Sequence, residues 1–164
     1  MISQFRGHYS FLSNFHLAWQ RVGQLWYPSN EHFFQAHKTL IWVEHLEIAQ
    51  APTPAIAKRM GGPRGCKMPD GRLFKITIRE DWKEIRVGFM SIGIDAKFGQ
   101  NPPLHKALLL THPHELCEGN YWHDNVWGDC LCARCSQSPG LNLLGRLLMV
   151  YRSKEVNYVV KKIL

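Results

Sequence analysis

Three polar side chains whose spacing suits chemistry occur in the segment YPSNEHFFQAHK, residues 27–38. If one helix runs from about residue 30 to about residue 43, Glu31, Gln35 and Lys38 fall within about 60° of one another, opposite its apolar face. A carboxylate, an amide and an amine so placed can contact a single ligand of ribose-phosphate size. The alternative is a solvent-exposed helix face, which is the commoner cause of such a pattern.

A second candidate site is the aromatic and acidic segment GNYWHDNVWGDC, residues 119–130, in a predicted loop. Loops carry binding residues more often than the elements they connect. A ring such as that of Trp127 can stack on a heterocyclic base, while a carboxylate holds sugar hydroxyls or protonates a leaving nitrogen. The alternative is that the aromatic residues anchor the core and that Asp124 and Asp129 cap turns.

A cluster of cysteines follows this segment directly. Cys130, Cys132 and Cys135 have the spacing of metal ligands, and in a reducing cytosol clustered cysteines favour metal or redox chemistry over disulfides. A structural zinc needs a fourth ligand. The candidates for that ligand are His114, Cys117 and His123. The sequence therefore predicts a candidate structural zinc site, or else three free thiols, and no cofactor required for catalysis.

The remaining sequence predicts the elements that position these residues. Short strands and turns are expected over residues 5–28, and helices over 54–60, 79–98 and 141–153. A further helix is expected to begin at Pro102 and Pro103 and to end before Pro113. Helices do not alternate regularly with strands, and no dinucleotide-binding fingerprint or P-loop occurs. We therefore expect an α+β fold, a single compact, mostly helical domain over residues 1–164 with a few short strands.

The charge of the chain restricts its partners. The 164 residues carry a formal net charge of +7, which favours anionic partners such as nucleotides, phosphorylated metabolites or nucleic acid. Lys58–Arg59 and Lys161–Lys162 are the only adjacent basic pairs in the sequence, so phosphate pockets are favoured over a polybasic tail. No targeting or membrane-spanning segment is recognisable, so we expect a cytoplasmic protein with no membrane partner. The oligomeric state is not predicted.

Seven segments, taken in order, resemble the NADAR (YbiA-like) family. The segments are FLSNF (11–15), YPSNEHFFQAHK (27–38), PTPAIAKRMG (52–61), REDWKEIRVGFM (79–90), KFGQNPPLHKALLLT (97–111), LCEGNYWHDNVWGDC (116–130) and GLNLLGRLLMVYR (140–152). The resemblance covers about residues 5–152 and leaves residues 153–164 as a C-terminal tail. The CLCARC sequence directly after Asp129 departs from the usual family pattern.

The resemblance implies a YbiA-like fold and an enzyme that hydrolyses N-glycosidic bonds. The bond would join a base-like amine to ribose phosphate or ADP-ribose. The implied substrates are ribosylamino-pyrimidine phosphates of riboflavin synthesis, or ADP-ribosylated guanine in nucleic acid. The alternative function is a nucleotide- or ADP-ribose-binding module with little turnover.

The resemblance also implies roles for individual residues. Glu31 matches the Glu of the family's S-x-E-H motif and would activate water or stabilise the ribosyl cation. Lys38, which closes the same segment, would bind phosphate or form a Schiff base with the opened sugar. Asp129 would act as an acid or as a ligand of hydroxyls. The residues expected to bind substrate are Asn14, Gln35, Lys58, Arg59, Trp127, Gly128 and Asn142.

Overall fold

The chain divides into two compact units. The computed structural model describes residues 1–135 and 137–163, with side chains for all of these except 157–163. The middle unit spans Asn14–Asn101, and the terminal unit combines Met1–Ser13 with the segment that begins at Pro102.

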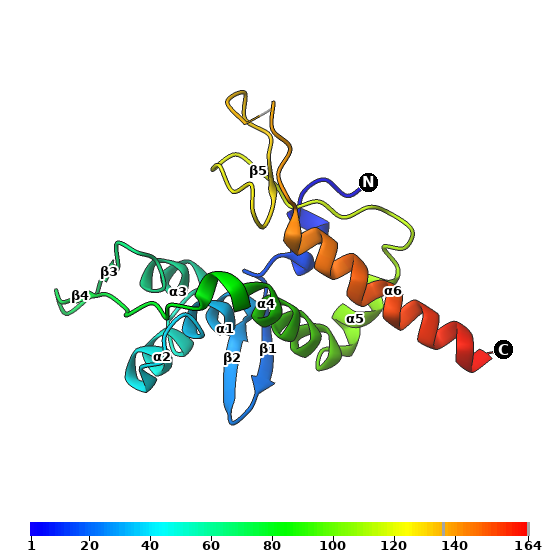
Figure 1. Cartoon of the computed structure of the whole chain (residues 1–164). Coiled ribbons are helices and arrows are strands. Elements are labelled where there is room, and N and C mark those ends of the chain that lie inside the picture. The colour runs from blue at the N-terminus through cyan, green and yellow to red at the C-terminus, as the bar shows by residue number, and fades with distance from the viewer. Residues whose placement is uncertain (136, 164) are drawn as a thin grey trace. The chain divides into compact units, whose positions relative to one another are not determined.

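The middle unit is built around the short helix α1 (Asn30–Ala36). It follows the antiparallel hairpin of β1 (Leu17–Val22) and β2 (Leu25–Ser29), and three more helices contact it, as Figure 1 shows. These helices are α2 (Trp42–Ala49), α3 (Pro54–Met60) and α4 (Trp82–Gly99). The side chain of Ser29 accepts a hydrogen bond from the backbone of His32 and so caps α1.

The core of the middle unit surrounds α1. Phe33 is fully buried, and its ring packs edge-on against Tyr27 with the centroids 5.3 Å apart. Gly93 lets α4 approach α1, because a Cβ atom at this position would collide with the side chain of Asn30. A small hairpin of β3 (Cys66–Lys67) and β4 (Leu73–Phe74) completes the unit.

The terminal unit joins the N-terminal segment to the C-terminal third of the chain. It contains the 3-10 helix η1 (Gly7–Leu12), α5 (Pro102–Leu109), β5 (Gly119–Asn120), β6 (Asp129–Cys130) and α6 (Leu143–Ile163). Strands β5 and β6 pair in parallel. On α6, Arg152 donates a hydrogen bond from Nη1 to the hydroxyl of Thr111 at 2.7 Å, and Tyr151 bonds to His105 at 3.1 Å.

The predicted fold class is confirmed. Residues 1–135 and 137–163 contain seven helices and a few short strands, and the helices expected over 54–60 and 79–98 are α3 and α4. Helix α6 continues ten residues past the expected end and takes in most of the predicted tail, whose last residue, Leu164, lies outside the described residues. No helix in the described ranges has both the length and the apolar composition needed to cross a membrane. That residues 1–164 form one domain stays a prediction.

The helix expected from about residue 30 to about residue 43 is wrong in its extent. Helix α1 ends at Ala36, and α2 begins only at Trp42. Between them, the hydroxyl of Thr39 accepts a hydrogen bond from the backbone of Ile41, and the carbonyl of Lys38 accepts one from the backbone of Arg79. These bonds replace the helical pattern, so α1 stops after seven residues, about two turns.

Candidate active site

Glu31 and Gln35 lie on α1 but are not exposed. Their relative exposures are 5% and 4%, so the interpretation of this face as a solvent-exposed one is wrong for both residues. Gln35 Nε2 donates a hydrogen bond to Glu31 Oε1 at 2.7 Å. The backbone N–H of Glu31 bonds to the carbonyl of Asn14 at 3.0 Å. A buried carboxylate is stable only when it is paired and hydrogen-bonded, and these contacts hold it in one orientation.

Lys38 follows α1 and shares the electrostatic environment of Glu31. Its Nζ donates a hydrogen bond to the carbonyl of Gly61 at 3.1 Å. Burial lowers the pKa of the Lys38 amine, the carboxylate of Glu31 raises it, and the charges of Lys58 and Arg86 lower it again. The amine of Lys38 is therefore influenced by one carboxylate and two further basic side chains, and this net positive charge favours an anionic ligand.

Two buried polar atoms near Glu31 and Lys38 have no hydrogen-bond partner among the described residues. They are Gln35 Oε1 and Arg86 Nε. Gln35 Oε1 lies so close to Gly61 that a Cβ atom there would collide with it. Because nearly all buried polar atoms in proteins are hydrogen-bonded, such atoms are candidates for contact with a ligand. We call Glu31, Gln35, Lys38 and Arg86 the α1 cluster.

Arg86 was not among the residues predicted from the sequence for the site. It lies on α4, within the segment REDWKEIRVGFM that carried part of the family resemblance. Its spacing from Lys38 gives no sign that the two charges interact. The only indication of its role in the sequence was its place within a segment that matches the family.

The other predicted binding residues of the middle unit have different surroundings. Lys58 and Arg59 are exposed on the last turn of α3, and Lys58 Nζ lies 5.4 Å from the centroid of the Phe15 ring. Asn14 is buried, and its Oδ1 accepts a hydrogen bond from Asn30 Nδ2 at 2.8 Å. Asn14 therefore supports the start of α1, and its contact with substrate stays a prediction.

Trp127, Gly128 and Asp129 lie in the terminal unit, in a turn that is fixed by hydrogen bonds. The carboxylate of Asp124 accepts from the backbone of Trp127 at 2.9 Å, which confirms that Asp124 caps a turn. Asp129 Oδ1 accepts from the backbone of Gly140 at 2.7 Å. A Cβ atom on Gly128 would collide with the carbonyl of Glu118, so this position has room only for glycine.

Asn142 holds the chain next to this turn. Its backbone has a φ of 47°, in the left-handed region that Asn tolerates better than most residues. Its side chain accepts a hydrogen bond from the backbone of Glu118 at 3.1 Å and donates one to the carbonyl of Leu116 at 2.9 Å. The amide thus ties α6 to the segment before β5, and its contact with substrate stays a prediction.

The three clustered cysteines lie together with His123. The ligand atoms of His123, Cys130, Cys132 and Cys135 are all within 4.8 Å of one another. Of the three candidates for a fourth ligand, the structure brings His123 to the cluster.

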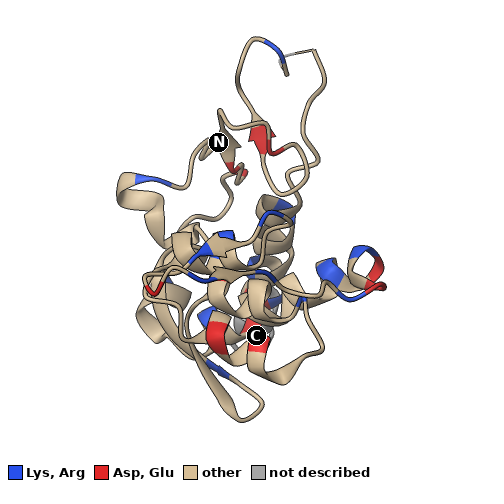
Figure 2. Ribbon diagram, turned by 90° about the vertical axis from the view of Figure 1, so that its left-hand side faces the viewer, with Lys and Arg blue, Asp and Glu red and all other residues tan. Residues whose placement is uncertain are grey.

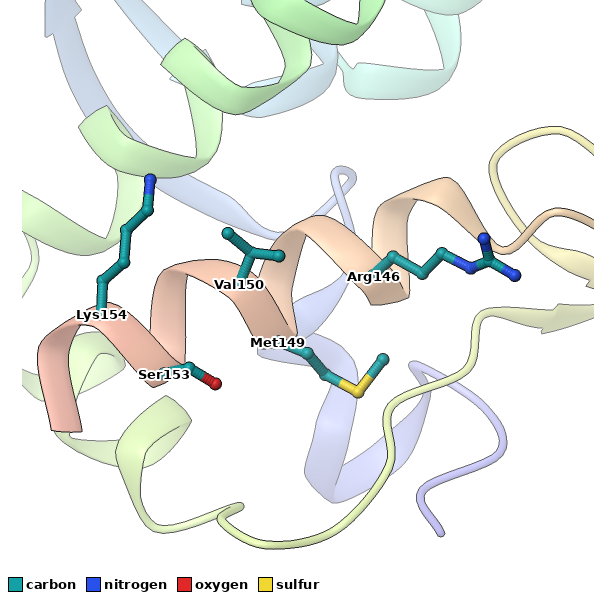
Figure 3. Close-up of a pocket in the computed structure, with 5 residues that line it drawn as sticks. All are labelled: Arg146, Met149, Val150, Ser153 and Lys154. Carbon is teal, nitrogen blue, oxygen red and sulfur yellow. The ribbon is translucent and has the colours of Figure 1, made fainter. Parts of the chain in front are cut away.

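A pocket of about 450 Å³ lies along α6 in the terminal unit. Figure 3 shows the side chains that line it projecting from this helix. The lining residues are Arg146, Met149, Val150, Ser153 and Lys154. No residue that the sequence predicted for the site lines this pocket.

Comparisons with known proteins agree on one family. The N-glycosidase YbiA of Escherichia coli is 34% identical over 148 residues, which cover 89% of this chain and 81% of that protein. A riboflavin biosynthesis protein of Vibrio vulnificus is 33% identical over 90% of this chain and 36% of its own length. The NMR structure of E. coli YbiA matches with a TM-score of 0.74 at 29% identity, over 98% of this chain and 89% of that one.

The match extends over nearly the whole sequence. The family model described as the NADAR domain covers residues 3–154, a slightly longer range than the motifs alone indicated. This chain belongs to the NADAR domain family.

Proposed function

We propose that this chain is an N-glycosidase that hydrolyses the bond between a base-like amine and ribose phosphate or ADP-ribose. The observation that carries the proposal is the α1 cluster, in which a buried carboxylate, Glu31, lies beside a partly buried amine, Lys38. The activities named for the YbiA relatives support the same reaction class. No metal takes part in the proposed chemical step.

Cleavage of an N-glycoside builds positive charge on the ribose, and a carboxylate beside the anomeric carbon stabilises that charge. In the proposed reaction Glu31 accepts a proton from a water molecule as its oxygen attacks the anomeric carbon. The carbon–nitrogen bond breaks, and its electron pair goes to the base nitrogen, which takes up a proton. This proton comes from the solvent, and the roles predicted for Asp129 as an acid or hydroxyl ligand and for Trp127 in stacking on the base stay predictions, because both residues belong to the terminal unit.

The basic side chains around Glu31 would hold the phosphate of the substrate. Lys38, Lys58 and Arg86 supply three positive charges against one carboxylate, and Arg59 adjoins Lys58 on α3. An Arg guanidinium binds phosphate through paired N–H groups, and the unpartnered Arg86 Nε is one such donor. Gln35 Oε1, which also lacks a partner, would accept a hydrogen bond from a ribose hydroxyl.

Lys38 allows a covalent variant of the same reaction. Burial lowers the pKa of its amine, so more of it is in the neutral, nucleophilic form than in an exposed lysine. Attack of this amine on the anomeric carbon would release the base and leave an imine to the opened sugar, which water would then hydrolyse. Borohydride added during turnover would reduce the imine and increase the mass of the chain. An unchanged mass during turnover would restrict Lys38 to binding.

The test is a hydrolysis assay on wild type, Glu31→Gln and a matched control, Glu47→Gln. Glu47 is a carboxylate on α2 that pairs with Arg72 at the surface. One substrate is a ribosylamino-pyrimidine phosphate of riboflavin synthesis, and the other is DNA that carries ADP-ribosylated guanine. We expect wild type and Glu47→Gln to release free base or ADP-ribose from one of them, and Glu31→Gln to lose at least about a hundredfold in rate. Equal rates for all three proteins would refute the role of Glu31.

The same assay identifies the partner. Lys and Arg residues occur on many different elements, as Figure 2 shows. We therefore propose that the partner is a ribosyl phosphate or an ADP-ribose group, whether free or attached to nucleic acid. Binding of ADP-ribose without release of product from either substrate would support the binding module instead.

A further inference from the structure

The loop that contains His123 and the clustered cysteines is long and has little secondary structure. Between the end of α5 at Leu109 and the start of α6 at Leu143, the described residues form only the two-residue strands β5 and β6. Several large hydrophobic side chains in this stretch are exposed, among them Trp122 and Leu131, by 51% and 43%. Loops longer than about 15 residues with little secondary structure are uncommon in compact domains, and those that occur are usually functional or act as linkers.

The four candidate ligands come from both arms of this loop. His123 follows β5, Cys130 ends β6, and Cys132 and Cys135 lie in the turn after it. His123 Nδ1 lies 3.3 Å from Cys135 Sγ, 3.4 Å from Cys132 Sγ and 3.9 Å from Cys130 Sγ. One imidazole nitrogen thus faces three sulfur atoms.

The separations of the nitrogen from the three sulfurs fit a tetrahedral site. Zinc binds sulfur at about 2.3 Å and imidazole nitrogen at about 2.0–2.1 Å. Tetrahedral angles then place nitrogen about 3.6 Å from each sulfur and the sulfurs about 3.8 Å from one another. The three observed distances from nitrogen lie on both sides of the first value, and every ligand pair is within 4.8 Å.

We infer that His123, Cys130, Cys132 and Cys135 bind one zinc ion that has a structural role. Three thiolates and one imidazole fill the four positions of a tetrahedral zinc, so none remains for water or substrate. A set of two or three thiolates without the imidazole would leave such a position open. Because the four protein ligands leave no position for water or substrate, this zinc would take no part in the proposed hydrolysis.

The zinc would fasten the two arms of the loop to each other. Cys130 directly follows Asp129, and the backbone of Leu131 donates a hydrogen bond to the carbonyl of Asn120 at 2.7 Å. The strands β5 and β6 are only two residues each, which is too little pairing to hold the arms together alone. Bound zinc would thereby add to the hydrogen bonds that hold the turn of Trp127, Gly128 and Asp129, because that turn lies between the ligands His123 and Cys130.

A disulfide is the main alternative use of these thiols. All five cysteines are free in the structure. One disulfide would join two of the cluster sulfurs at about 2.05 Å and leave the third sulfur and the imidazole without a function. A single metal ion would contact all three sulfurs and His123 Nδ1 at once, whereas a disulfide would involve two of the sulfurs only.

The experiment measures metal content in the whole chain, purified without a histidine tag and dialysed after incubation with zinc. We expect about one zinc ion per chain in wild type and in the control Cys117→Ser, and less than about a tenth of that in Cys132→Ser and His123→Ala. Cys117 is a free cysteine of the same unit that is outside the cluster. Wild type without retained zinc, or equal loss of zinc in Cys117→Ser and Cys132→Ser, would overturn the inference.

A second measurement uses wild type alone, so it does not depend on whether the variants fold. Replacement of zinc by cobalt(II) should give the intense visible bands of a tetrahedral site together with thiolate-to-cobalt charge transfer in the near ultraviolet. A weak, octahedral spectrum would overturn the inference. Both readouts are independent of enzymatic activity, so they test the zinc site even if the proposed hydrolysis is wrong.

Discussion

His37 should make the stability of the protein depend on pH. Its ring packs against Phe33 and Phe89, with centroid distances of 4.2 Å and 4.7 Å, and its Nδ1–H donates a hydrogen bond to the carbonyl of Phe33 at 2.8 Å. The pKa of His37 is lowered from 6.5 to about 4, mainly by burial; the hydrogen bond to Phe33 opposes this, and the charges of His45 and Arg79 add to it. The folded protein therefore holds this imidazole in its neutral form.

The sign and size of the effect follow from the two pKa values. Because the pKa is lower in the folded state, the unfolded chain binds more protons, and stability falls as pH decreases. The contribution is fully present above pH 6.5 and is lost as the pH falls toward 4. Between pH 7 and pH 5 the free energy of unfolding should decrease by about 2 kcal/mol through His37 alone. For a chain of this length, that corresponds to roughly 4–8 °C in melting temperature.

The assay is urea unfolding of wild type and His37→Phe between pH 7 and pH 5. Phenylalanine keeps the ring contacts and does not titrate. We expect the free energy of unfolding of wild type to fall by about 2 kcal/mol more than that of the variant over this range. His32 and His45, whose pKa values are also lowered by burial, leave some pH dependence in both proteins. Parallel profiles for the two proteins would refute the reasoning.

Three further substitutions test contacts of the candidate sites. Gly61→Ala should destabilise the fold by about 1–3 kcal/mol, measured by denaturant unfolding, because the added methyl collides with Gln35. Asn142→Gly keeps the backbone conformation but loses both amide hydrogen bonds, and should cost about 1–3 kcal/mol in the same measurement. Arg86→Met should raise KM for a phosphorylated substrate about tenfold or more with little change in unfolding; an unchanged KM would remove Arg86 from the site.

The sequence was sufficient to predict the elements that local signals define. Thr53 and Pro54 begin α3, and Gly61 follows its last turn, so both ends of this helix are readable from residue types. The break after Ala36 was not readable, because one of the hydrogen bonds that form it comes from Arg79, far away in the sequence. Such contacts leave no periodic trace in the residues that they affect.

The same distinction applies to the candidate sites. Cys130, Cys132 and Cys135 reveal themselves by their spacing, while His123 joins them through a loop whose course no pattern specifies, including a φ of 65° at His123 itself. Similarly, Glu31 and Lys38 belong to one segment, but the pKa of Lys38 is also lowered by Arg86 from α4.

The arrangement of charges in the α1 cluster is not the one expected of a group that only stabilises the fold. Burying a carboxylate and an amine together rarely stabilises a fold more than apolar residues of the same size would. Here the amine of Lys38 contacts a carbonyl, Gly61 O, and two more cations, Lys58 and Arg86, lower its pKa further. A purely structural ion pair gains nothing from these additional positive charges, whereas a phosphate bound beside Glu31 would be attracted by all of them. The excess of positive charge around one buried carboxylate is therefore more readily explained by a charged ligand than by folding.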